Sequence, residues 1–327
     1  MIKRRGFITL LGGAAVVWPL GARAQQPAIP VIGVLSTRSA ADSANASAAF
    51  HSGMKETGFV DGQTVAVEYR WAESQHDRLL EVATDMVRAR VKVIAAIGPP
   101  AAVAAKAATT TVPIVFTVGS DPVKIGLVAS LGRPGGNATG VNIFSAELGT
   151  KRLGLLRDLM PAASVVALLV NPHFPNVGSY VSEVEAAARE IGQQIRVLHA
   201  GNEAEIDAAF ATILQMHAEA VLVAADPFFV SRRDQIVELA ARHAIPAVYE
   251  AREFPAAGGL MSYGTSLIDG YRQIGIYTGR ILKGERPADL PVVQSTKFEF
   301  VMNLNAAKPL GLEVPPGLSA GATEVIE

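Results

Sequence analysis

Acidic and aromatic side chains follow apolar runs in the second half of the sequence. Asp226 and Glu250 each stand directly after such a run. A carboxylate at either position can pair with the ammonium group of a ligand, while Phe174, Phe228 and Tyr263 can stack on an apolar or aromatic group. The alternative roles are a turn or a helix N-cap for Asp226 and a core position for Phe228.

A second set of candidates lies near a Pro-Pro pair in the first half. Pro99 and Pro100 lack N–H groups, but Ala101 and Ala102 are expected to present free donors at a helix start, which is a natural seat for a ligand carboxylate. The alternative is that the prolines simply begin a helix. Further candidates share a place just after a predicted strand: Ser36, Thr37, Pro99, Ser120, Asp121, Asn171 and Asn176.

Motifs for catalysis and metal binding are missing from the sequence. Residues 317–321, Gly-Leu-Ser-Ala-Gly, match the nucleophile-elbow pattern, but they follow two prolines instead of a strand, and no histidine lies beyond His243. The six histidines lack the spacing of a metal site, and there is no cysteine. We therefore expect no catalytic residue, no bound metal and no cofactor.

Two stretches of the chain follow one plan. Residues 31–119 and 165–250 both alternate apolar strands with amphipathic helices, at an offset of about 130 residues. The continuous apolar runs are typical of strands buried on both faces of a parallel sheet, which predicts an α/β protein with two doubly wound, Rossmann-like lobes. Ligands of such sheets bind beyond the carboxyl ends of the strands, where the candidates stand. One predicted helix face consists of Ala46, Ala49, Phe50, Gly53 and Met54.

The chain is expected to pass between the lobes three times. The first lobe takes residues 27–143 and about 265–290, and the second takes 144–264 and about 291–327. Such a three-segment hinge allows two lobes to close on a small molecule in the cleft between them.

The first 24 residues have the features of an export signal. Basic residues 3–5 precede an apolar run that ends at the small-x-small cleavage pattern of residues 22–24. Arg4 and Arg5 fit twin-arginine export, with Sec export as the alternative. Cleavage lowers the formal charge from −1 to −5, which argues against a nucleic-acid partner. With no cysteine for a lipid, we expect a free periplasmic protein that is not a lipoprotein.

Nearly the whole mature chain resembles a known family. The matching segments are 94–106, 112–116, 120–123, 126–130, 133–140, 258–264 and 298–304. They resemble the periplasmic substrate-binding components of ABC transporters, in the branch similar to the tryptophan- and tyrosine-binding proteins. The resemblance implies a type I periplasmic-binding fold that closes on a small-molecule ligand and delivers it to a permease and its ATPase in the inner membrane.

The residues at the strand ends suit an amino acid, an aromatic acid or a similar carboxylate as the ligand. Two other functions stay open for this architecture: a periplasmic ligand-sensing module and a secreted α/β enzyme. A DNA-binding regulator of the related fold is disfavoured, because an export signal stands where a helix-turn-helix would lie.

Overall fold

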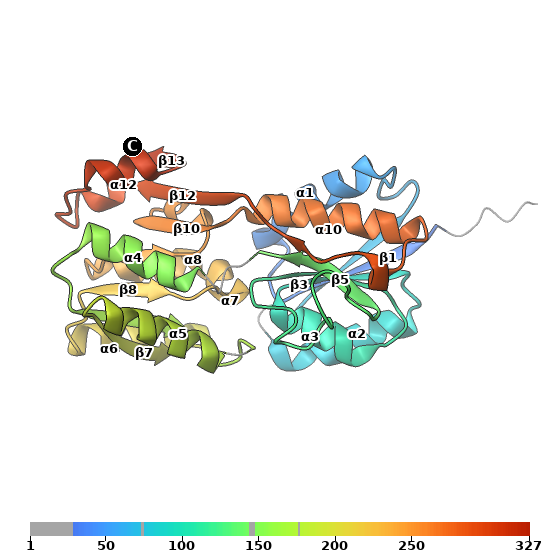
Figure 1. Ribbon diagram of the computed structural model, residues 1–327, viewed down its shortest axis with the longest axis horizontal. Coiled ribbons are helices and arrows are strands. Elements are labelled where there is room, and N and C mark those ends of the chain that lie inside the picture. Colours follow the sequence, from blue (N-terminus) through green and yellow to red (C-terminus); the bar gives the residue numbers. More distant parts are fainter. Residues whose placement is uncertain (1–28, 73–74, 144–147, 176) are drawn as a thin grey trace, which may run out of the picture.

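The protein consists of two lobes that lie side by side along the long axis (Figure 1). The computed structural model describes residues 29–72, 75–143, 148–175 and 177–327, so the expected export signal (1–24) and Asn176 lie outside the described residues. Each lobe is built on one sheet, with strand order β11-β5-β4-β3-β1-β2 in the first and β13-β12-β10-β9-β8-β6-β7 in the second. The predicted pair of doubly wound α/β lobes is confirmed.

The first sheet is parallel throughout. Every residue of three of its four inner strands, β3, β4 and β5, is buried, because these strands are covered by helices on both faces. The strands are β1 (Val31–Ser36), β2 (Ala66–Trp71), β3 (Val93–Ile97), β4 (Ile114–Val118), β5 (Ala138–Asn142) and β11 (Val293–Gln294).

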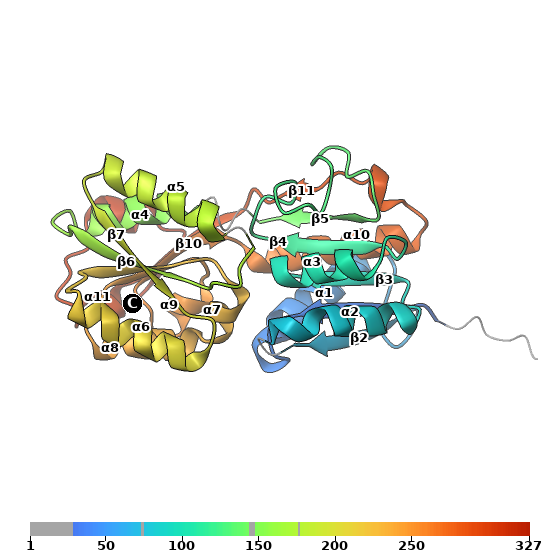
Figure 2. The same ribbon diagram turned by 90° about the horizontal axis from the view of Figure 1, so that it is seen from below.

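Two helices cover each face of the first sheet (Figure 2). On one face lie α2 (Leu79–Arg88) and α3 (Pro99–Ala108), and on the other lie α1 (Ala44–Glu56) and α10 (Leu267–Leu282). Three short 3₁₀ turns complete the lobe: η1 (Ala41–Ser43), η2 (His76–Arg78) and η3 (Pro287–Asp289).

The second sheet is parallel from β7 to β10, while β12 runs antiparallel to β10 and the edge strand β13 runs parallel to β12. Its strands are β6 (Val165–Val170), β7 (Gln194–His199), β8 (Ala220–Val223), β9 (Ala247–Tyr249), β10 (Met261–Thr265), β12 (Phe298–Asn303) and β13 (Glu324–Ile326). Its helices are α4 (Gly149–Leu159), α5 (Val177–Glu190), α6 (Glu203–Gln215), α7 (Pro227–Ser231), α8 (Arg233–Arg242), α9 (Glu253–Ala256), α11 (Leu304–Ala307) and α12 (Pro316–Gly321).

The chain crosses between the sheets after β5, after β10 and between β11 and β12. Because β11 pairs with β5, the third crossing lies beyond Gln294 and therefore a few residues later than the expected boundary near 291. The crossings are bonded to one another: the Thr265 hydroxyl donates to the Ile143 carbonyl, and the Ser266 N–H donates to the Lys297 carbonyl at 2.9 Å. Among the described residues, no helix has both the length and the apolar character needed to cross a membrane.

Candidate ligand-binding site

A pocket opens between the lobes at the carboxyl ends of the strands, where open parallel sheets bind their ligands. This interlobe pocket is lined by residues of both lobes, among them Arg38, Pro99 and Tyr271 from the first and Phe174, Asp226 and Glu250 from the second. Its cavity volume is about 50 Å³. Since one water molecule needs roughly 10–15 Å³ of such space, the lobes stand close together.

Arg38 brings a positive charge to the interlobe pocket from the loop after β1. Its backbone N–H donates to the Ser36 hydroxyl at 3.1 Å, and its guanidinium donates to the Asp42 carbonyl. Burial by itself lowers the pKa of Arg38, but Tyr271, Glu253 and Asp42 outweigh burial and the pKa is raised. Arg38 is therefore a cation over the whole physiological range, although it is only 4% exposed.

Asp226 combines two of the roles that its sequence position suggests. One carboxylate oxygen, Oδ1, accepts from the Phe228 N–H at 2.7 Å and from the Asn171 amide at 3.3 Å, so Asp226 is the N-cap of α7. The other oxygen, Oδ2, has no hydrogen-bond partner among the described residues. Burial raises the pKa of Asp226 from 3.8 to about 7. Asp226 thus supports the helix through one oxygen and is also one of the residues that line the interlobe pocket.

Glu250 places a second carboxyl group beside the first. Its Oε1 accepts a hydrogen bond from the Asp226 backbone N–H at 2.9 Å. Burial raises the pKa of Glu250 to about 7; Arg152 opposes this shift and the neighbouring Asp226 adds to it. The pocket therefore holds two carboxyl groups that change charge near neutral pH, and an approaching cation would favour their ionised forms.

The remaining walls of the interlobe pocket are mostly apolar. Ile97, Ile143 and Leu267 line it from the first lobe, and Phe174 and Val230 line it from the second. Phe174 is 9% exposed, so its ring offers a surface for an apolar group without leaving the protein interior. The interlobe pocket thus combines an arginine, two carboxyl groups and apolar walls.

The helix start after Gly98 is buried beside the interlobe pocket. Ala101 and Ala102 are fully buried in the core between α2 and α3, and the Ala102 N–H donates to the Gly98 carbonyl at 3.0 Å. Neither alanine lines the interlobe pocket, so a carboxylate site at this helix start stays a prediction, while the prolines do begin a helix. Pro99 does line the pocket.

Two of the predicted aromatic contacts lie away from the interlobe pocket. Phe228 is 2% exposed in the core of the second lobe, where its ring lies 5.5 Å from that of Phe229. Tyr263 points to a different part of the second lobe and stacks on Phe298 with ring centroids 6.3 Å apart. Neither side chain lines the interlobe pocket, whereas Phe174, the third aromatic candidate, does line it, together with Tyr271.

The other candidates lie beside the pocket. Ser36 at the end of β1 and Thr37 and Ser120 in the adjoining loops are buried without lining it. Asn171 acts through Asp226, while Asp121 accepts from the Val123 N–H at 2.8 Å and so shapes a turn. The sequence analysis missed Arg38, because the sequence places this residue in a loop after a strand but does not show which way its side chain points. A single charge in an otherwise uncharged strand-end loop, Ser36-Thr37-Arg38-Ser39, was the available signal.

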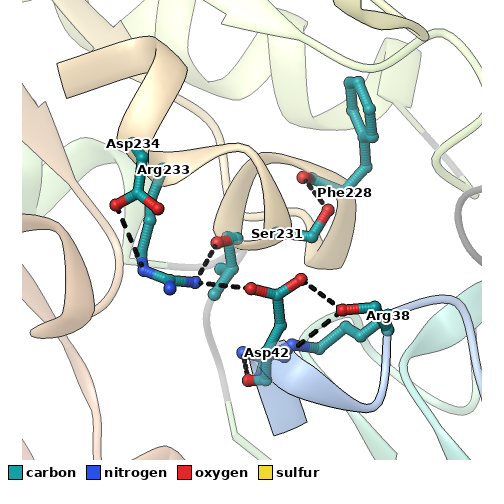
Figure 3. A network of polar contacts seen from close by, with 8 residues as sticks. Arg38, Asp42, Phe228, Ser231, Arg233 and Asp234 are labelled. Atoms are coloured by element: carbon teal, nitrogen blue, oxygen red, sulfur yellow. Dashed lines mark hydrogen bonds and ion pairs between the residues drawn. The ribbon is translucent and has the colours of Figure 1, made fainter. Parts of the chain in front are cut away.

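Polar contacts bridge the lobes at the rim of the pocket. Figure 3 shows Arg233 of α8 reaching Asp42 of η1, with Nη1 and Oδ1 3.1 Å apart, while the same Asp42 holds Arg38 through its carbonyl. On another part of the rim, His76 of the first lobe and His173 of the second stack with ring centroids 5.7 Å apart. The structure is thus a closed arrangement in which the lobes touch.

The sequence profile of the family described as ABC transporter substrate binding protein matches residues 31–326. The chain belongs to this family. Substrate-binding proteins of the family are extracellular or periplasmic, and the homologues found are substrate-binding proteins, not enzymes. The resemblance noted in the sequence is thereby confirmed, and among the described residues no cluster of three or more metal-ligating side chains is found.

Two relatives have names that state a ligand, and a third is a ligand-free structure. A tyrosine-binding protein of Clostridioides difficile (strain R20291) is 25% identical over 268 residues, which cover 81% of this chain and 76% of that protein. A Streptococcus pneumonia ABC domain in complex with L-Trp is 25% identical and has a TM-score of 0.83. The superposition covers 91% of this chain and 100% of that chain. A ligand-free, open substrate-binding protein from Clostridium difficile is 24% identical, with 91% and 99% coverage and a TM-score of 0.63.

Proposed function

We propose that this protein is the substrate-binding component of an ABC importer and that it binds a small zwitterion of the amino-acid type between its lobes. One observation carries the proposal: a buried arginine from one lobe and two buried carboxyl groups from the other line the same pocket. A molecule that bears a carboxylate and an ammonium group complements both sides at once.

Arg38 is the proposed partner of the ligand carboxylate. A guanidinium presents its N–H donors in a planar fork that matches a carboxylate. Arg38 already donates to the Asp42 carbonyl, which holds the side chain in place before a ligand arrives. A preorganised donor of this kind loses little conformational entropy on binding.

Asp226 and Glu250 are the proposed partners of the ligand ammonium. Oδ2 of Asp226 has no partner among the described residues, so it can accept a hydrogen bond without losing one. Phe174 and Leu267 then face the apolar body of the ligand. This arrangement is compatible with the aromatic amino acids named for two of the relatives.

Hinge closure is the proposed route by which a bound ligand signals to the membrane partner. A cavity of about 50 Å³ is too small for an amino acid to enter, so the lobes have to separate first. The greater likeness to the L-Trp complex than to the open relative supports a closed arrangement here. A ligand that touches both lobes stabilises that arrangement by its differential affinity.

Export and delivery complete the proposal. The basic and apolar composition of residues 1–24 supports cleavage and release of the mature protein into the periplasm. There the closed, ligand-loaded form would dock on a permease that is driven by an ATPase.

Titration calorimetry with the mature protein tests the ligand class. We expect L-tryptophan or L-tyrosine to bind more tightly than tryptamine, which lacks the carboxylate. The Arg38→Gln variant should lose at least roughly 30-fold in affinity for the amino acid, because an unpaired buried charge costs about 2 kcal/mol or more. Its affinity for tryptamine should change little.

The Arg88→Gln variant is the matched control, because Arg88 is an exposed arginine of the same lobe, on α2. It should bind like the wild type. Tight binding of neutral sugars or nucleobases alone, with no dependence on Arg38, would refute the proposed ligand class while leaving the family assignment intact.

A further inference from the structure

A second pocket lies in the second lobe, at the ends of the strands that are opposite to the interlobe pocket. It opens between the carboxyl-terminal half of α8 and the segment around α11, and it has a volume of about 300 Å³. Ile245 stands before β9 and Leu260 before β10, so this far pocket lies at the amino ends of the parallel strands. Its volume is well above that of an apolar cavity of roughly 150 Å³ that holds a benzene molecule.

The walls of the far pocket are apolar because α8 presents small residues to it. Val237, Ala240, Ala241 and Ala244 lie at i, i+3, i+4 and i+7 on one face of the helix and its C-terminal end. Among the described residues, no charged side chain lines the pocket. The polar Asn303 has its amide occupied: it donates to the Pro255 carbonyl at 3.0 Å and accepts from the Ala306 N–H at 3.1 Å.

The lining also includes the exposed Asn305, and one buried polar group has no hydrogen-bond partner among the described residues. Tyr249 lines the pocket, is fully buried, and its hydroxyl has no hydrogen-bond partner among the described residues. Its ring stacks on Phe254 with centroids 4.4 Å apart and reaches Gly259, where an added Cβ would lie 2.7 Å from Cε2, next to the hydroxyl-bearing carbon. Burial raises the pKa of Tyr249, so the hydroxyl stays neutral. A buried hydroxyl without a partner is costly, and a ligand that bonds to it removes that cost.

We propose that the far pocket is a second small-molecule site, which takes an uncharged compound with a compact apolar or aromatic body and one hydrogen-bonding group for the Tyr249 hydroxyl. This site would not bind the zwitterion proposed for the interlobe pocket, because no charged side chain of the described residues lines it. Both sites can be filled at the same time, since they lie at opposite ends of the strands of the second sheet and share no lining residue.

The probes for the test are 4-methylphenol and toluene, which share a ring and differ in one hydroxyl group. We expect both to shift the amide and methyl NMR signals of Ala240, Ala241 and Leu260 in the full mature chain. The phenol should bind roughly three- to tenfold more tightly, because it bonds to Tyr249. The Tyr249→Phe variant should bind toluene as before and lose the preference for the phenol.

Variants that fill the far pocket provide a second test. Ala240→Phe, or Ala241→Phe at the rim if the first variant fails to fold, should abolish binding of both probes, whereas Ala211→Phe on the exposed face of α6 should not. The proposal is overturned if neither probe binds at millimolar concentration, if pocket-filling leaves binding unchanged, or if Tyr249→Phe keeps the preference. Sedimentation that reveals a dimer dissociated by Ala241→Phe would assign the pocket to a second copy of the chain and would also overturn it.

Discussion

Asp42 of the first lobe and Arg233 of the second form an ion pair across the cleft, with Oδ1 and Nη1 3.1 Å apart. They are 191 residues apart in sequence, and their side chains are only 20% and 24% exposed. Asp42 also accepts a hydrogen bond from Arg38 through its carbonyl (Figure 3). Asp42 thus contacts both Arg38, the proposed partner of the ligand carboxylate, and Arg233, its ion-pair partner in the other lobe.

The Asp42→Asn variant should release its ligand faster than the wild type. The change removes one charge of a partly buried pair that exists only when the lobes meet, and a loss of about 1–2 kcal/mol corresponds to a five- to thirtyfold faster dissociation. Stopped-flow fluorescence with an aromatic amino acid measures this rate. Asp85→Asn removes the acid of an exposed ion pair within α2 and should leave the rate unaltered. Equal rates in both variants would show that the Asp42–Arg233 pair does not hold the closed form.

Gly98→Ala should hinder closure without harming the fold more than a matched control. Gly98 has φ +87°, and an added Cβ would lie 2.9 Å from Cγ of Pro227 in the other lobe. Gly58 has φ +89° with no atom within 4 Å of an added Cβ, so Gly58→Ala carries the same backbone strain without the clash. Small-angle scattering with saturating ligand should show a larger radius of gyration for Gly98→Ala alone. The same compaction in both variants would argue against contact between these two loops in the closed form.

Asp226→Asn should make the thermal stability of the ligand-free protein less dependent on pH. The folded pKa of Asp226, about 7, lies above its ordinary value of 3.8, so folding favours the protonated form. The resulting stability is fully present below about pH 4 and is lost as the pH rises through 7. Asparagine also caps helices and has no charge, so the variant should melt higher than the wild type at pH 8 and close to it at pH 5.

Asp158→Asn is the control for this titration, since Asp158 lies exposed on α4. It should follow the wild-type curve of melting temperature against pH. Part of the wild-type slope should persist in Asp226→Asn, because Glu250 has its pKa raised in the same direction. A wild-type melting temperature that rises steadily from pH 5 to pH 8 would contradict the buried, protonated carboxyl groups.

Binding of an amine-bearing ligand should release protons near pH 6. Both carboxyl groups of the interlobe pocket are partly protonated there, and an ammonium group favours their ionised forms. Affinity should therefore rise between pH 5.5 and 8. Calorimetry in buffers of different ionisation enthalpy counts the released protons, and a heat that is the same in every buffer would exclude this coupling.

The architecture follows from the sequence because it depends on burial alone. Helix α1 buries Ala46, Ala49, Phe50, Gly53 and Met54, which is the set that the helical spacing predicts. Apolar runs likewise predict strands buried on both faces, and their order fixes where the carboxyl ends meet. The positions of Asp226 and Glu250 beside the pocket follow from that topology without further information.

The other contacts of the site could not be predicted, because they depend on the directions of side chains and on which elements meet in space. The pattern of residue types along the sequence specifies neither. Phe228 lies two residues after Asp226, but the first turn of α7 directs its ring into the core. Tyr263 lies on a strand, where a neighbouring aromatic on β12 decides which contact it makes. The Asp42–Arg233 pair depends on how the two lobes meet, and residues so far apart in sequence give no local signal of it.

Gly53→Ala should be among the most destabilising single-methyl additions in the first lobe. An added Cβ at Gly53 would lie 1.9 Å from the Arg272 carbonyl oxygen, and one at Gly275 would lie 2.2 Å from the Phe50 carbonyl oxygen, so α1 and α10 meet backbone to backbone. Backbone atoms cannot rotate away as a side chain can, so we expect a loss of about 3 kcal/mol and a fall in melting temperature of roughly 6–12 °C. Gly154→Ala, inside α4 with no atom within 4 Å, should instead stabilise the protein by up to about 1 kcal/mol. Calorimetric melting of the two variants gives both numbers, and equal melting temperatures would mean that α1 and α10 do not cross this closely.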